Sequence, residues 1–125
     1  MIKSVTLLYR NPALTQEEFR DYWVNVHAPM VRAALPSLIV YNCGFPLADA
    51  GSGGFDASSE QFADGFECDA IVELGFSDHE TMERELGEPA FNSPERLKSS
   101  SHLMDLPRCR MIVLDVVDIP LNGQE

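Results

Sequence analysis

The hydrophobic residues of this chain fall into short alternating runs and into longer runs with helical spacing. The run over residues 66–76 alternates most clearly, with apolar residues at every even position and Glu67, Asp69 and Glu73 among the odd positions. Because successive side chains of a strand point to opposite faces, this run predicts a strand with one apolar and one acidic face. Three further runs, rich in β-branched, aromatic and apolar residues, predict strands over residues 2–9, 38–45 and 109–117.

Two capping boxes predict where the helices begin. In each, Ser or Thr is followed three residues later by Glu: Thr15 with Glu18, and Ser77 with Glu80. After the first box, apolar residues recur at steps of three and four, which predicts an amphipathic helix that ends near residues 32–34. Pro29 falls inside this pattern, so we expect the last turn of the helix to be kinked or separate.

The second box should start a helix that turns Met82 and Leu86 inward, and residues 94–104 predict a short further helix. Residues 49–65 are rich in Gly and Ser and predict a long flexible loop. The order of elements is then β-α-β-β-α-β. This is the ferredoxin-like arrangement of an α+β protein, a four-stranded antiparallel sheet with helices on one face.

The face of the sheet without helices also needs to be covered. The first strand carries Val5 and Leu7 on one side and Ile2 and Leu8 on the other, so neither side is plainly polar. A second copy of the same sheet is the simplest cover for such a face. We therefore expect a homodimer.

Composition and charge narrow the class of protein. The 125 residues, with 45% hydrophobic and 23% charged residues, suit a single domain over residues 1–125. The 9 basic and 20 acidic residues give a net charge of -11, which repels phosphate backbones and anionic lipids. The first ten residues do not resemble a signal peptide, and no stretch is long enough to span a membrane. We expect a cytoplasmic protein that binds neither nucleic acid nor membranes.

No cofactor motif stands out. Cys43, Cys68 and Cys109 lie in apolar runs and match no zinc spacing, so we expect free, unreactive thiols in a reducing compartment. The chain contains no HExxH, no CxxC and no Gly-rich phosphate loop after a strand. We therefore expect neither a metal nor an organic cofactor.

His27 is the leading candidate for chemistry. It lies four residues after Trp23 and eight after Phe19, so it borders the buried stripe of the first helix. An imidazole that faces a pocket there suits proton transfer near neutral pH. The alternative is a structural histidine at the end of the helix, where the helix dipole favours a positive charge.

Carboxylates and aromatic residues supply the other candidates. Asp69 and Glu73 share one face of the predicted strand and suit an acid–base pair, or alternatively ion pairs with nearby arginines. Tyr41 can donate a hydrogen bond to a substrate oxygen, and Trp23 and Tyr9 can line an aromatic pocket with it. Packing in the core is the alternative role for these three aromatic residues.

The helix motif also points to a family. The segment LTQEEFRDYWVNVHAP, residues 14–29, resembles the signature of the EthD family, in which a Phe-x-x-Tyr-Trp helix leads into His-Ala-Pro. Leu35-Pro36 followed by Tyr41, and the run DAIVELGF from Asp69, are similar to the family too. The resemblance spans roughly residues 2–91. It implies a dimeric α+β barrel with two sheets face to face, and it favours a functional role for His27.

The resemblance implies a small organic substrate and leaves the reaction open. The wider group includes proteins linked to ether degradation, cofactor-free oxygenases, polyketide cyclases, dehydratases and an isomerase. We expect a cofactor-independent enzyme of isomerase, dehydratase or oxygenase type in catabolism or secondary metabolism. In it, His27 would move a proton while Asp69 or Tyr41 positions the substrate. The alternative is a non-catalytic binding or auxiliary protein of an oxygenase or ether-degradation system.

Overall fold

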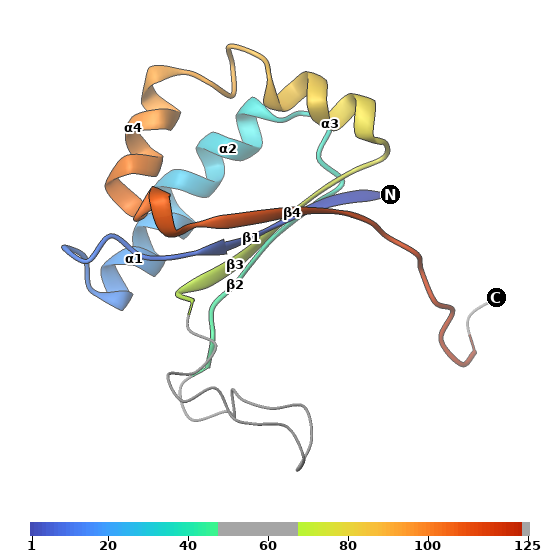
Figure 1. The fold of residues 1–125 in the computed structure, drawn as a ribbon, viewed down its shortest axis with the longest axis horizontal. Helices are drawn as coiled ribbons and strands as arrows, with labels where there is room; N and C mark the ends of the chain where they lie inside the picture. Colours follow the sequence, from blue (N-terminus) through green and yellow to red (C-terminus); the bar gives the residue numbers. More distant parts are fainter. Residues whose placement is uncertain (48–67, 124–125) are drawn as a thin grey trace.

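The computed structural model describes residues 1–47 and 68–123. Four strands form one antiparallel sheet in the order β2-β3-β1-β4 (Figure 1): β1 (Ile2–Leu8), β2 (Val40–Gly44), β3 (Ala70–Phe76) and β4 (Arg110–Asp115). The four strands and the ferredoxin-like α+β arrangement expected from the sequence are confirmed. The loop expected over residues 49–65 lies outside the described residues.

The helices lie on one side of this sheet (Figure 1). They are α1 (Gln16–Tyr22), the π-helical turn η1 (Trp23–His27), α2 (Ala28–Ala34), α3 (His79–Leu86), α4 (Pro94–Leu103) and the short 3-10 helix η2 (Leu106–Arg108). No helix in the described ranges is long and apolar enough to cross a membrane.

The first capping box is confirmed, and the second is corrected. Thr15 accepts a hydrogen bond from the Glu18 backbone N–H, and the Glu18 side chain accepts one from the Thr15 N–H. The N-cap of α3 is Asp78 rather than Ser77, because the Asp78 carboxylate accepts the Thr81 N–H at 2.7 Å. Asp caps a helix as well as Ser does, and its negative charge suits the positive end of the helix dipole.

Pro29 changes the helix without ending it. Proline has no N–H to donate to the carbonyl four residues before it, so a regular α-helix loses a bond at this point. The chain forms a π-helical turn that ends at His27, two residues before Pro29, and the Ala28 N–H bonds to the Trp23 carbonyl, five residues earlier. The helix then continues to Ala34, so the expected kink takes the form of a widened turn.

The strand registers define the two faces of the sheet. Ser4 lies opposite Leu74 and Val113, so these three residues share the face that the helices cover. The apolar even positions of β3 point to the helices, as expected, and pack into the core. The opposite face is named the outer face here. Its apolar residues are Val5, Leu7, Val40, Ile71, Ile112 and Leu114.

The outer face is not the acidic face that the alternation in residues 66–76 predicts. Glu73 does lie on it, but its carboxylate is 3.5 Å from the Lys3 ammonium and accepts a hydrogen bond from Asn42. Asp69 precedes β3 and lies at the end of the sheet. The pattern overestimated the acidity because neighbouring strands contribute apolar residues to the same face.

Candidate functional site

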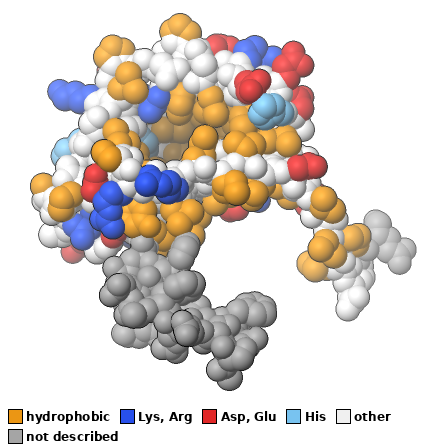
Figure 2. Space-filling model, in the orientation of Figure 1, with side chains coloured by type: hydrophobic (Ala, Val, Ile, Leu, Met, Phe, Trp, Pro, Cys, Tyr) orange, Lys and Arg blue, Asp and Glu red, His pale blue; other side chains and the backbone are white. Residues whose placement is uncertain are grey.

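A cavity of about 180 Å³ lies between the helices and the covered face of the sheet. Figure 2 shows a hollow with hydrophobic side chains between the helices and β4. Met111 and Val113 of β4 point to the helix side but remain exposed, so the helices leave this edge of the sheet open. The cavity is lined by residues of β1, β2, β3 and the helices, and by Met104, Leu106 and Cys109 before β4.

His27 reaches this cavity from the end of the π-helical turn. Phe19, Trp23, His27 and Val31 follow one another at steps of four and form a single buried stripe. The His27 side chain is only 3% exposed, and its ring lies 4.7 Å from the Trp23 ring between centroids. Its buried place next to Trp23 matches the position that the helical spacing predicts, and the helical backbone continues past it into α2.

A chain of hydroxyl groups holds the His27 ring. His27 Nδ1 lies 2.8 Å from the Ser99 hydroxyl of α4, which lies 3.1 Å from the Tyr22 hydroxyl. Among the described residues, the other ring nitrogen, Nε2, has no hydrogen-bond partner. A hydroxyl that accepts from Nδ1–H keeps the proton on Nδ1 and leaves the lone pair of Nε2 available.

Burial keeps the His27 imidazole neutral. Loss of water around the ring is the main cause, and the positive charge of Arg96 adds to it; together they lower the pKa of His27 from 6.5 to about 4. His27 is therefore an uncharged imidazole at neutral pH. In that form it can accept a proton, which a charged imidazolium cannot do.

Two buried polar atoms in this cavity lack a partner within the described part of the chain. They are the Trp23 indole Nε1–H and the Tyr41 hydroxyl, and both residues line the cavity. Burial, with the nearby Cys43, raises the pKa of Tyr41, so its hydroxyl stays protonated. Buried donors are normally satisfied, so this pair points to hydrogen bonds made with something that enters the cavity.

Arg96 adds a positive charge to the cavity wall. Its guanidinium donates to the Phe91 carbonyl at 2.6 Å, to the Asn92 side-chain oxygen at 3.2 Å and to the Ser100 hydroxyl at 3.3 Å. It also lies 3.9 Å above the centre of the Phe91 ring. These contacts fix the guanidinium in the helix that faces His27.

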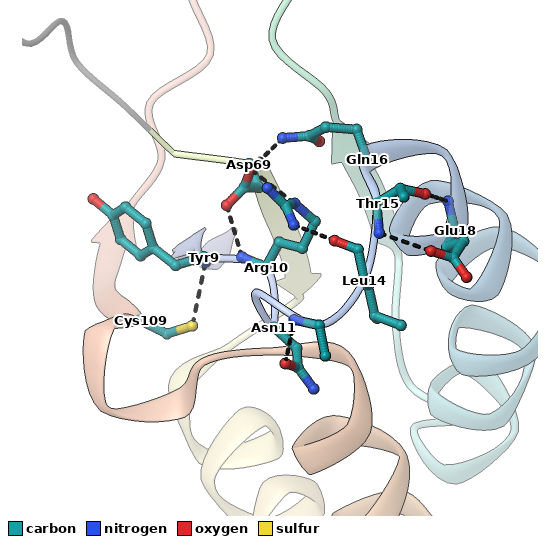
Figure 3. A network of polar contacts seen from close by, with 10 residues as sticks. Tyr9, Arg10, Asn11, Leu14, Thr15, Gln16, Glu18, Asp69 and Cys109 are labelled. Carbon is teal, nitrogen blue, oxygen red and sulfur yellow. Dashed lines mark hydrogen bonds and ion pairs between the residues drawn. The ribbon is translucent and has the colours of Figure 1, made fainter.

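The structure brings together three of the predicted site residues: His27, Tyr41 and Trp23 line one cavity. Asp69 lies elsewhere and bonds the loop after β1 (Figure 3). Its carboxylate accepts hydrogen bonds from the Arg10 backbone N–H, at 2.7 Å, and from the Gln16 side chain. In this place Asp69 ties β3 to the start of α1.

Glu73 and Tyr9 also lie away from the His27 cavity. Glu73 is on the outer face with Lys3. The Tyr9 ring carries the Arg108 guanidinium 4.3 Å from its centre, and its backbone N–H contacts the Cys109 sulfur (Figure 3). The three cysteines are free, and burial is the main cause that raises the pKa of each thiol. The described residues contain no group of three His, Cys, Asp or Glu side chains placed to hold a metal ion.

Sequence reasoning did not find Arg96, Ser99 and Ser100. They come from α4, whose sequence is mostly polar and shows no clear apolar stripe. Ser99 and Ser100 are nevertheless buried, and Arg96 is half-buried. The available signal was the spacing, since residues three and four positions after Arg96 share its side of a helix.

The elements define a ferredoxin-like α+β protein with a cavity between its helices and its sheet. The chain matches the EthD domain over residues 11–96, more than half of its length. The protein belongs to the EthD family, as the helix motif suggested. No curated protein matches the chain.

Solved structures of low sequence identity share the fold. An EthD family protein from Bacillus halodurans C-125 is 15% identical with a TM-score of 0.64, and the match covers 94% of this chain and 100% of that one. A dimeric ferredoxin-like protein of unknown function from Thermobifida fusca YX is 15% identical, with a TM-score of 0.60 and coverage of 92% and 90%. A dimeric protein of unknown function with a ferredoxin-like fold from Bacteroides fragilis NCTC 9343 is 8% identical, with a TM-score of 0.56 and coverage of 92% and 95%.

Proposed function

We propose that this protein is a cofactor-independent enzyme that moves a proton on a small organic substrate, with His27 as the base. One observation carries the proposal: a neutral imidazole lines the same cavity as two donors without a partner among the described residues, Trp23 Nε1–H and the Tyr41 hydroxyl. A base beside hydrogen-bond donors is the arrangement that carbanion chemistry next to a carbonyl needs.

The proposed step begins with a substrate that has a C–H bond next to a carbonyl group. His27 Nε2 removes this proton, and the electron pair moves onto the carbonyl oxygen to form an enolate. Tyr41 and Trp23 donate hydrogen bonds to that oxygen. Where a C=C bond is conjugated with the enolate, His27 returns the proton to the far carbon as the carbonyl re-forms, which is isomerisation. Where the next carbon carries a hydroxyl group, the electron pair of the enolate forms a C=C bond and expels this group, and His27 protonates it to water, which is dehydration.

A binding protein without turnover is the second candidate. The low pKa of His27 favours it, because an imidazole with a pKa of about 4 is a weaker base than one with a pKa near 7. An anionic intermediate beside the ring would raise that pKa, which is the reason we prefer the enzyme. Proton transfer therefore has to be measured directly.

Deuterium exchange tests the enzyme proposal without knowledge of the natural substrate. Phenylpyruvate and benzoylacetate are single-ring compounds with exchangeable C–H bonds next to a carbonyl, and NMR in D₂O follows the loss of these protons. We expect the protein to accelerate the exchange, and His27→Gln to lower the acceleration by roughly two orders of magnitude, as loss of a general base does.

The exposed His79 provides the matched control, since His79→Gln makes the same substitution far from the cavity on α3. This variant should keep the full exchange rate, and melting curves of both variants should show that they are folded. An exchange rate that His27→Gln leaves unchanged, or no acceleration by the wild-type protein, would contradict the enzyme and favour the binding protein.

We further propose that the protein is a homodimer joined through the outer face. Support comes from the apolar residues of that face, for which the described part of the chain provides no cover. Two of the similar structures are of proteins named as dimeric. The cavity lies on the opposite side of the sheet and stays accessible in such a dimer.

A further inference from the structure

The cavity beside His27 has an unusual balance of charge. Among its lining residues in the described ranges, Arg96 alone carries a charge at neutral pH, and none is Asp or Glu. The whole chain, by contrast, has 20 acidic and 9 basic residues.

Arg96 also has no counter-ion among the described residues. Its hydrogen bonds go to a backbone carbonyl, an amide oxygen and a hydroxyl, and it forms no ion pair within the described part of the chain. A guanidinium group partly removed from water is stabilised by a negative charge close to it. An anion in the cavity would supply the missing partner.

The hydrogen-bonding groups of the cavity agree with the charge. The Trp23 indole can only donate a hydrogen bond, and the guanidinium of Arg96 can only donate. Burial keeps the Tyr41 hydroxyl protonated and able to donate. A ligand that satisfies Trp23 and Tyr41 must therefore offer acceptor atoms.

The volume limits the size of that ligand. An apolar cavity of about 150 Å³ is large enough to hold benzene. The cavity here measures about 180 Å³ and is lined mostly by apolar side chains, such as Leu8, Val72 and Leu74. It suits one ring, or a chain of similar size, with a small polar substituent.

We propose that this cavity binds a molecule about the size of a single substituted ring that carries an anionic oxygen, a carboxylate or an ionised enol. Arg96 pairs with the negative charge, and Trp23 and Tyr41 donate hydrogen bonds to the oxygen. This inference rests on the proposed function, because it names the substrate class for the same cavity. The net charge of the protein does not prevent it, since charges beyond about 8 Å are largely screened at physiological salt.

Trp23 supplies the readout for a binding test. It is the only tryptophan, so its indole N–H gives a single signal in a ¹⁵N-correlated NMR spectrum. Benzoate and phenylacetate are the anionic probes, and benzamide and phenylacetamide are neutral probes of the same shape. We expect each carboxylate to move the Trp23 signal and to bind at least about tenfold more tightly than its amide.

Substitution of Arg96 tests the origin of this preference. Arg96→Met keeps an unbranched stem without the charge and should abolish the preference for carboxylates. Arg96→Lys keeps the positive charge without the planar guanidinium and should retain part of the preference for carboxylates. The matched control is Arg84→Met, which removes the same charge from the exposed side of α3 and should preserve the preference. If the Arg96 variants do not fold, the salt dependence of the wild-type protein decides: added NaCl should weaken binding of benzoate and not of benzamide.

The outcomes separate this inference from the proposed function. If the amides bind the wild-type protein as tightly as the carboxylates, the anionic ligand is wrong, while the cavity remains a binding site. If no probe moves the Trp23 signal, this inference also fails. Carboxylate binding that depends on Arg96, without exchange that depends on His27, would instead overturn the proposed enzyme and keep this ligand class.

Discussion

His27 couples the stability of the fold to pH. The folded protein holds its imidazole in the neutral form with a pKa of about 4, whereas an unfolded chain leaves it at its ordinary 6.5. Above pH 6.5 the ring is neutral in both states, so the fold has its full stability. As the pH falls from 6.5 towards 4, the unfolded chain takes up a proton that the folded chain does not, and stability is lost.

We therefore expect the free energy of unfolding to fall between pH 6.5 and pH 4, with a His27 contribution on the order of 3 kcal/mol. His27→Gln removes this contribution. The free energy of unfolding of the variant, relative to that of the wild type, should therefore rise by the same amount as the pH falls from 6.5 to 4. Urea denaturation at several pH values measures both curves. Parallel curves for the two proteins would show that His27 is not held neutral in the fold.

Part of the site could be predicted from single residues. Helical spacing placed Trp23 and His27 on one buried stripe, and the family motif added Tyr41. Asp69 lies outside this cavity, and its carboxylate accepts the Arg10 backbone N–H and lies 3.6 Å from the Arg10 guanidinium, the ion pair that the sequence offered as its alternative role. Arg96 and Ser99 could not be predicted, since their roles depend on how α4 packs against η1.

The start of α3 offers a direct test of helix capping. The backbone N–H of Thr81 donates a hydrogen bond to the Asp78 carboxylate. This hydrogen bond is the main cause of the lowered pKa of Asp78. We expect Asp78→Ala to lower the melting temperature by roughly 3 to 6 °C, as loss of an N-cap does. Ser77→Ala, at the position that the sequence pattern favoured, should change it much less. A larger effect of Ser77→Ala would place the cap one residue earlier.

The elements themselves followed closely from local patterns. The strands predicted from alternating and apolar runs and the helices predicted from capping residues and spacing form at the predicted places, within a few residues at each end. The π-helical turn over Trp23–His27 was not predictable as such. Pro29 indicates that a hydrogen bond is lost, but whether the chain bends, breaks or widens depends on the packing of the stripe against the sheet.

The outer face of the sheet and the C-terminal residues after β4 expose apolar side chains without cover in the described structure. Val117, Ile119 and Leu121 are 79%, 80% and 66% exposed, and this tail extends away from the body of the domain (Figure 1). Four strands of about six residues give a sheet face of roughly 400 Å². A standard interface buries about 800 Å² on each partner, so we expect the tail to contribute to the dimer as well.

Light scattering at micromolar concentration should accordingly give twice the mass of the chain. Ile112→Asp places a charge on the outer face of the edge strand β4, next to Val5 of β1, where burial against a second sheet would remove it from water, and should shift the protein to monomers. Met111→Asp is the matched control, because it adds the same charge to the helix side of the same strand and should leave the dimer intact.

Removal of residues 117–125 should weaken the dimer without abolishing it. A wild-type monomer would rule out the dimer, and dissociation by both Asp variants would move the interface from the outer face to the edge of β4.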